Sequence, residues 1–153
     1  MLIKKHYDWL PSSIPKELGE TLNQEYLQTL DLDEELVKTY EFMQLYAMGL
    51  EQMVWDQEIL GIKFATDFKE CEFKLRSVLC EIQNAIMERG IMPRPNVNRD
   101  RMPPEYRADD LRRDTTCRIT RDWVIFRDYM NGLEYVKEVF AYLRSRYIQS
   151  NQI

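Results

Sequence analysis

Histidine and glycine are both scarce in this sequence, which contains one histidine, His6, and five glycines. A Ser-His-Asp or Cys-His catalytic site would have to be built on His6, in an irregular stretch where nothing fixes the imidazole tautomer. Ferritin-like di-iron chemistry needs Glu-x-x-His pairs on two helices, and the sequence has none. The small number of glycines argues against an all-β fold, which requires many tight turns. These shortages favour a helical protein without a histidine-based site.

The cysteines are equally uninformative about chemistry. Cys71, Cys80 and Cys117 lack the Cys-x-x-Cys spacing typical of zinc sites, and no glycine-rich phosphate-binding loop is present. We therefore expect no catalytic residue, no cofactor and no metal, in a protein that is not an enzyme. An odd number of cysteines permits one disulfide and one thiol, or three buried thiols.

Long hydrophobic runs are also missing. No stretch of ~20 apolar residues occurs, so we expect no insertion into a membrane. Residues 1–10 lack the apolar run of a secretory signal peptide. We therefore expect either a cytoplasmic protein or a secreted protein whose leader has been removed. The sequence has no N-x-[ST] sequon, which supports neither alternative.

The formal net charge of −5 is unevenly distributed along the chain. Acidic residues dominate before Glu72, whereas arginines crowd residues 89–121. A basic stretch of this kind can bind nucleic acid. The alternative is a solvated surface, which is favoured because acidic residues and prolines interrupt the arginines. We expect no nucleic-acid partner.

The most regular hydrophobic pattern lies in residues 118–146. Its apolar residues follow one another at steps of three or four, which places them along one side of an α-helix. We predict a helix over 109–147 that buries this stripe. Gly132 lies inside it and costs ~1 kcal/mol relative to alanine, which indicates a close helix contact or a local bend. The predicted stripe consists of Ile119, Trp123, Phe126, Met130, Leu133, Val136, Phe140, Leu143 and Tyr147.

Two further amphipathic helices are predicted, over 33–60 and 66–89. Asp31 or Asp33 can cap the first, Asp31 and Glu34 have the spacing of a capping box, and Gly61 is a natural stop. Prolines break residues 1–31, which we expect to be irregular, with a short helix in 15–30 as an alternative. Tyr7, Trp9 and Leu10 should pack on something larger. Residues 32–148 would form a helical bundle within one domain, 1–153.

Connection lengths restrict the topology of this all-α fold. A short link makes the first two long helices antiparallel neighbours. The proline-rich segment 91–108 is long enough, at ~3.3 Å per residue, to span a whole helix, so the second and third helices can be parallel. A short link followed by a long crossover is typical of the last three helices of an up-up-down-down four-helix bundle.

With these features the chain resembles the long-chain four-helix cytokines of the interleukin-6 and interleukin-12 group, including the ciliary-neurotrophic and cardiotrophin-like ligands. Residues 85–95 (AIMERGIMPRP) are similar to the end of helix C and its proline-rich exit. Residues 121–126 (RDWVIF) are similar to the start of helix D. The three long helices then correspond to helices B, C and D. Helix A is absent or stunted, either because 15–30 substitutes for it, because it was removed, because a second chain supplies it, or because it never existed.

The resemblance implies a secreted, non-enzymatic ligand that binds cell-surface cytokine receptors and brings two receptor chains together. Several members of the group use a Phe-x-x-Lys pair at the start of helix D; Thr115 and Arg118 occupy these positions here, so the charge is kept and the aromatic is not. Trp55 lies off its helical stripe and is either an exposed contact residue or a cover for the bundle end. The candidate receptor contacts are Trp9, Trp55, Thr115, Arg118, Arg121, Arg127 and Asp128.

Two further expectations accompany this interpretation. If helices C and D are parallel, their first turns lie at the same end, and Cys71 could form a disulfide with Cys117. The alternative function is an intracellular, cytoplasmic helical adaptor or binding protein that captures a partner helix in an apolar groove.

Overall fold

The computed structural model describes residues 7–62 and 65–150, and within these ranges it contains helices but no strands. The predicted all-α fold with three long packed helices is confirmed. The predicted bounds of the first two long helices, 33–60 and 66–89, agree with the structure to within one residue. The elements in chain order are α1 (Gln24–Gln28), α2 (Leu32–Leu60), α3 (Ala65–Glu88), η1 (Arg99–Arg101), η2 (Pro104–Tyr106), α4 (Asp109–Arg113) and α5 (Thr115–Ser150).

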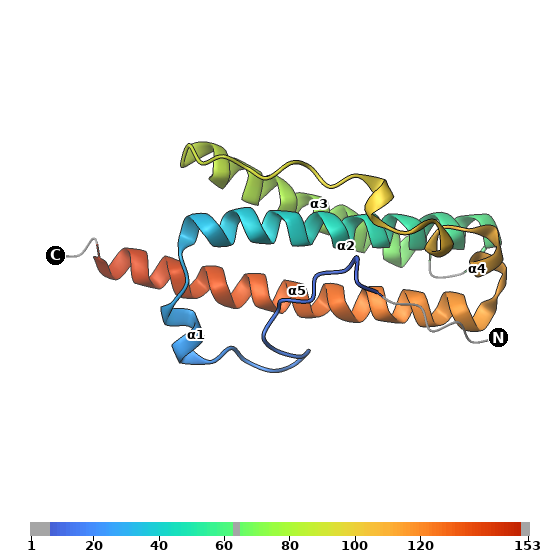
Figure 1. The fold of residues 1–153 in the computed structure, drawn as a ribbon, viewed down its shortest axis with the longest axis horizontal. Helices are drawn as coiled ribbons and strands as arrows, with labels where there is room; N and C mark the ends of the chain where they lie inside the picture. The colour runs from blue at the N-terminus through green and yellow to red at the C-terminus, as the bar shows by residue number, and fades with distance from the viewer. Residues whose placement is uncertain (1–6, 63–64, 151–153) are drawn as a thin grey trace.

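The three long helices have the predicted directions. Helix α3 returns antiparallel to α2, and α5 runs parallel to α3 (Figure 1). Helix α2 packs against both of them, whereas α3 and α5 meet more sparsely, for example where the rings of Phe68 and Phe126 stand edge to face at 5.7 Å. The segment between α3 and α4 crosses back over the length of α2 (Figure 1).

Helix α2 is the central element and is buried on several sides. Its ends have the predicted caps. The side chain of Asp31 accepts a hydrogen bond of 3.1 Å from the backbone N–H of Glu34, and Gly61 adopts a left-handed conformation with φ of 67°. These caps satisfy backbone groups that the helix itself leaves unpaired.

The third predicted helix differs from the structure at its start. Asp114 is extended between α4 and α5, and its carboxylate accepts the backbone N–H of Cys117 at 3.1 Å. A short acidic side chain that caps the following turn competes with helix continuation. The long helix therefore begins at Thr115, not at residue 109.

The buried face of α5 also differs from the predicted stripe. Ile119 and Trp123 are 58% and 59% exposed, so the prediction that they are buried is wrong. Tyr147 is exposed too, Leu143 is buried, and the other members of the stripe are half-buried. The face that is buried instead consists of Arg121, Ile125, Tyr129, Gly132, Tyr135, Val139 and Leu143.

Two glycines explain this rotation of α5. A Cβ atom on Gly132 would lie 2.5 Å from Cε2 of Tyr46, and one on Gly49 would lie 2.8 Å from Cγ2 of Ile125. Glycine on each helix therefore lets α2 and α5 approach closely, and the predicted close contact at Gly132 is confirmed. A stripe built from large apolar residues cannot detect a contact made by residues without side chains.

Residues 7–31 cross α2 and α5 as an extended segment, which we call the strap (Figure 1). Trp9 and Leu10 are buried in the main core beside Tyr106, so the expectation that this region packs on a larger body is confirmed. Further along, Leu22, Leu27 and Leu30 form a second cluster with Tyr135, Val139 and Leu143 of α5. Most of the strap is irregular, as predicted, and from residue 7 onward α1 is the one helix that it contains.

The crossover is held along α2 by specific contacts. The backbone N–H of Val97 donates to Oε1 of Gln44 at 2.8 Å, and Arg94 pairs with Glu41 at 3.3 Å. The side chains of Met102 and Tyr106 are buried. Segment 91–108 is thus joined to the core through Met102 and Tyr106, while most of its other residues are exposed.

Candidate protein-binding surface

An exposed stripe marks the beginning of α5. Thr115, Ile119, Trp123 and Arg127 follow at intervals of four, which aligns them on one side of the helix, and all four are exposed. We call these residues the α5 opening face. Adjacent large apolar side chains in water are typical of interaction sites, and tryptophan is among the residues that contribute most to protein–protein binding.

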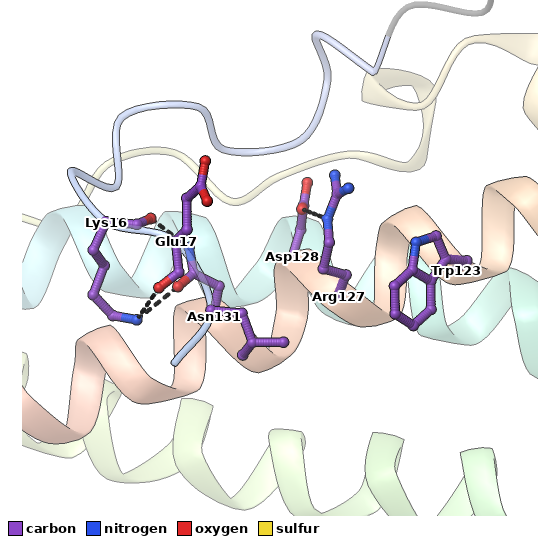
Figure 2. A pocket seen from close by; sticks show the side chains of 7 residues that line it. Lys16, Glu17, Trp123, Arg127, Asp128 and Asn131 are labelled. Carbon is purple, nitrogen blue, oxygen red and sulfur yellow. Dashed lines mark hydrogen bonds and ion pairs between the residues drawn. The ribbon is translucent and has the colours of Figure 1, made fainter. Parts of the chain in front are cut away.

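A cleft of about 460 Å³ adjoins this face. Figure 2 shows Trp123 at one end of the cleft, Lys16 and Asn131 at the other, and Arg127 and Asp128 between them on α5. The strap supplies the opposite wall through residues 16–18, including the exposed side chain of Leu18. The cleft is therefore formed jointly by the strap and α5.

Lys16 fixes the strap wall in place. Its side chain is 1% exposed and its Nζ lies 2.8 Å from Oε1 of Glu134. The same ammonium donates to Oδ1 of Asn131 at 2.7 Å, and Nδ2 of Asn131 donates to the carbonyl oxygen of Lys16 at 3.0 Å. The hydrogen bond from Lys16, followed by that from the backbone N–H of Gly19, lowers the pKa of Glu134. These contacts join the strap to α5, and Glu134 neutralises the buried charge of Lys16.

The middle of the cleft carries an ion pair close to solvent. Nε of Arg127 lies 3.1 Å from Oδ1 of Asp128. Partial burial raises the pKa of Asp128, against the opposing effect of Arg127. The cleft therefore combines an aromatic end, an apolar residue on the strap and a paired charge. That combination suits recognition of another protein.

Within residues 7–62 and 65–150, no group of three His, Cys, Asp or Glu side chains is placed to hold a metal ion. None of the helices described is both long and apolar enough to span a membrane.

Arg121 is the clearest error among the predicted contact residues. Its side chain is fully buried, where Nη1 pairs with Oδ2 of Asp56 at 2.7 Å and donates to the carbonyl oxygen of Tyr106 at 2.8 Å. Polar residues on a helix generally face solvent, but Arg121 lies inside the protein, where it has a buried counter-charge on α2. Arg121 cannot contact a receptor in this fold.

The other predicted contacts are dispersed. Thr115 and Arg127 lie on the α5 opening face, and Asp128 lies in the cleft beside it. Arg118 is half-buried and donates to the carbonyl oxygen of Arg112 at 2.8 Å. Trp9 was also wrongly predicted as a contact, because it is buried against Tyr106.

Trp55 lies on a different surface. It is 42% exposed near the end of α2, where the guanidinium of Arg99 lies 4.9 Å from its ring centroid. Of the two alternatives for this residue, exposure is the one observed. Trp55 lines a pocket other than the cleft at Trp123.

The three cysteines are thiols. The predicted disulfide between Cys71 and Cys117 is therefore not formed in this structure. Burial raises the pKa of the Cys71 thiol, which reduces its reactivity as a thiolate.

The sequence-based reasoning missed Ile119, Trp123, Lys16 and Leu18 as surface residues of interest. One available signal was the width of the predicted stripe on α5. Steps of three and four residues average about 3.5, whereas one turn of an α-helix has about 3.6 residues. Over a long helix the members of the stripe therefore shift gradually around its axis. Such a broad stripe is wider than a single neighbouring helix covers, so part of it had to be exposed or covered by something else.

Comparison with protein-family models, with curated proteins and with solved structures finds no match for this chain.

Proposed function

We propose that this protein is a secreted cytokine-like ligand, without enzymatic activity, that binds the extracellular domain of a cell-surface receptor through the α5 opening face. The observation that carries the proposal is the exposure of Ile119 and Trp123 on consecutive turns at the start of α5. Arg127, Asp128 and Thr115 surround them with groups able to make polar contacts. A central aromatic residue within a polar rim is typical of protein-binding sites.

The arrangement of the long helices supports the same class. Helix α2 neighbours both α3 and α5, which run parallel and meet only sparsely. This is how helices B, C and D are arranged in an up-up-down-down bundle, with C and D on a diagonal. A further segment or a second chain that completes such a bundle remains part of this proposal. Binding two receptor chains at separate surfaces would bring their intracellular parts together.

The test is a binding screen against cytokine-receptor ectodomains of the source species by surface plasmon resonance. Trp123→Ala and Ile119→Ala should each weaken binding by about 10-fold or more, which corresponds to ~1.4 kcal/mol. Phe73→Ala is a matched control, because Phe73 is an exposed aromatic residue on α3. Circular dichroism should show that all three variants are folded.

Two results would reject this function. One is the absence of binding to any ectodomain, and the other is a bound receptor whose affinity is unchanged by Trp123→Ala and Ile119→Ala. The second candidate, an intracellular adaptor that captures a partner helix, is favoured by the three thiols. Full reduction of all three cysteines in the natural source would support that adaptor.

A further inference from the structure

A second, smaller pocket lies between α2 and the crossover, away from the α5 opening face. Its volume is about 140 Å³, whereas pockets for drug-sized ligands occupy about 300–1,000 Å³. It therefore suits one amino-acid side chain better than a cofactor or metabolite. We call it the Trp55 pocket; it is lined by Met48, Glu51, Gln52, Trp55, Arg99, Met102 and Arg107.

The charges in the lining do not cancel. Arg99 and Arg107 are cationic, while Glu51 is the one acidic residue and forms an ion pair with Arg99. The amide of Gln52 is occupied, since its Nε2 donates to Oδ1 of Asp56 at 3.0 Å. One positive charge, on Arg107, is left without compensation inside the lining.

Arg107 also has an unused donor. Its Nε is buried and has no hydrogen-bond acceptor among the residues that the structure describes. A buried donor without an acceptor costs free energy, and the cost is larger for a charged group. An anion bound against the half-buried Arg107 side chain would offset part of that cost through its charge, so the pocket suits a negatively charged group.

The rest of the lining limits the kind of anion. Met102 and Met48 are buried, and the guanidinium of Arg99 lies 4.9 Å from the centroid of the Trp55 ring. Apolar walls strengthen an ion pair by lowering the local dielectric constant. A carboxylate at the end of a short aliphatic stem matches these walls, and its two oxygens match the geometry of a guanidinium.

The surroundings favour an acidic partner at longer range. Segment 91–108 has four arginines and two acidic residues, a formal charge of +2, although the whole chain carries −5. Such a local excess attracts acidic surfaces before contact is made.

From these observations we infer that the Trp55 pocket receives one aspartate or glutamate side chain of a partner protein, with Arg107 as its principal donor. The partner's identity as a receptor rests on the proposed function, whereas the capture of a carboxylate does not. The pocket shares no lining residue with the cleft at Trp123, so the two surfaces can act separately.

The first experiment needs no receptor. The protein is titrated with N-acetyl-glutamate N-methylamide while the side-chain Nε–H signals of its arginines and the indole signal of Trp55 are followed by NMR. We expect saturable shifts for Arg107 and Trp55, with a dissociation constant in the millimolar range (~4 kcal/mol). The uncharged glutamine analogue should give none, and inorganic phosphate should bind more weakly than the glutamate derivative.

Variants assign the site. Arg107→Gln and Arg107→Lys should each weaken binding about 10-fold, while Arg127→Gln, at the other surface, should leave it unchanged. Arg107→Lys keeps the charge and protects the test against a variant that fails to fold. No saturable shift, equal shifts with the glutamine analogue, tighter binding of phosphate, or unchanged binding in both Arg107 variants would overturn the inference.

A second experiment tests whether the Trp55 pocket contributes to receptor binding. If a receptor ectodomain is found, Arg107→Gln should lower its affinity about 10-fold, and a receptor affinity that stays unchanged would refute the role in partner binding. If no receptor is found but the glutamate derivative binds, the receptor proposal fails while the carboxylate pocket stands. The two failures are thus distinguishable.

Discussion

Asp56 on α2 and Arg121 on α5 form an ion pair of 2.7 Å in which the two side chains are 1% and 0% exposed. Nε of Arg112 donates to the other carboxylate oxygen of Asp56 at 2.7 Å, and Nη2 of Arg121 lies 2.8 Å from Asp122. The cluster therefore contains two arginines and two aspartates. Since Trp123 follows Arg121 by two residues, ~200° around the helix, an inward Arg121 turns Trp123 outward. The buried pair and the exposed tryptophan are consequences of one rotation of α5.

Removing one member of this pair should be strongly destabilising. Arg121→Ala leaves the buried carboxylate of Asp56 without one of its two cations, and the free energy of unfolding should fall by about 3–5 kcal/mol. Urea denaturation followed by circular dichroism measures it. The exposed pair of Lys69 and Glu58 is the control, since Lys69→Ala should cost about 0–1 kcal/mol. Equal costs for the two substitutions would show that Arg121 is not paired in the interior.

The contact at Gly132 predicts an outcome opposite to that expected from helix propensity. Alanine is favoured over glycine in a helix by ~1 kcal/mol, but its Cβ would lie 2.5 Å from the ring of Tyr46. Gly132→Ala should therefore lower the free energy of unfolding by about 1–3 kcal/mol through overpacking. Ala141→Gly is the control on the exposed side of α5. It should lower the free energy of unfolding by ~1 kcal/mol, because glycine has the lower helix propensity. A Gly132→Ala variant that gains stability would contradict the close approach of the helices.

Buried tyrosines should make the protein sensitive to alkali. Burial raises the pKa of Tyr106 and of Tyr129 to about 12 in each case, while an unfolded tyrosine ionises near pH 10. Between these values the unfolded chain binds fewer protons than the folded one, so stability falls as pH rises. These two tyrosines should leave the free energy of unfolding unchanged below about pH 10 and lower it progressively between about pH 10 and pH 12. Denaturation at a series of pH values should show a smaller slope in Tyr129→Phe; an unchanged slope would exclude Tyr129 as a source.

The strap should loosen when Lys16 loses its charge. Lys16→Met removes the partner of Glu134, whose Oε1 also accepts the backbone N–H of Gly19 at 2.8 Å. Amide exchange at Gly19 should become faster in this variant, while Glu17→Gln, an exposed neighbour, should leave it unchanged. Because the pKa of Glu134 is lowered in the folded protein, its contribution is present above the ordinary glutamate pKa and lost as pH falls below it. If neither Lys16→Met nor acidic pH changes the exchange rate at Gly19, this contact does not hold the strap.

Local chemistry made much of the fold predictable. The caps at Asp31 and Gly61 act within a few residues of the chain, so their types alone located the ends of α2. The short link and the long crossover restricted the helix directions for purely geometric reasons. In the site, Arg127 and Asp128 were named because polar residues on a helix generally face solvent, and Arg127 is exposed while Asp128 is half-buried. Thr115 was named only through the cytokine resemblance, and it is exposed.

The sequence by itself thus determined the helical class, the approximate length of each long helix and the opposite directions of α2 and α3, because these depend on periodicity, capping and reach. Only the tertiary structure decided the rotation of α5. That rotation follows from side chains far apart in sequence, namely Asp56 against Arg121 and Tyr46 against Gly132, and no local pattern contains such pairs. The same pairings buried one predicted contact, Arg121, and exposed Trp123, which the sequence had assigned to the core.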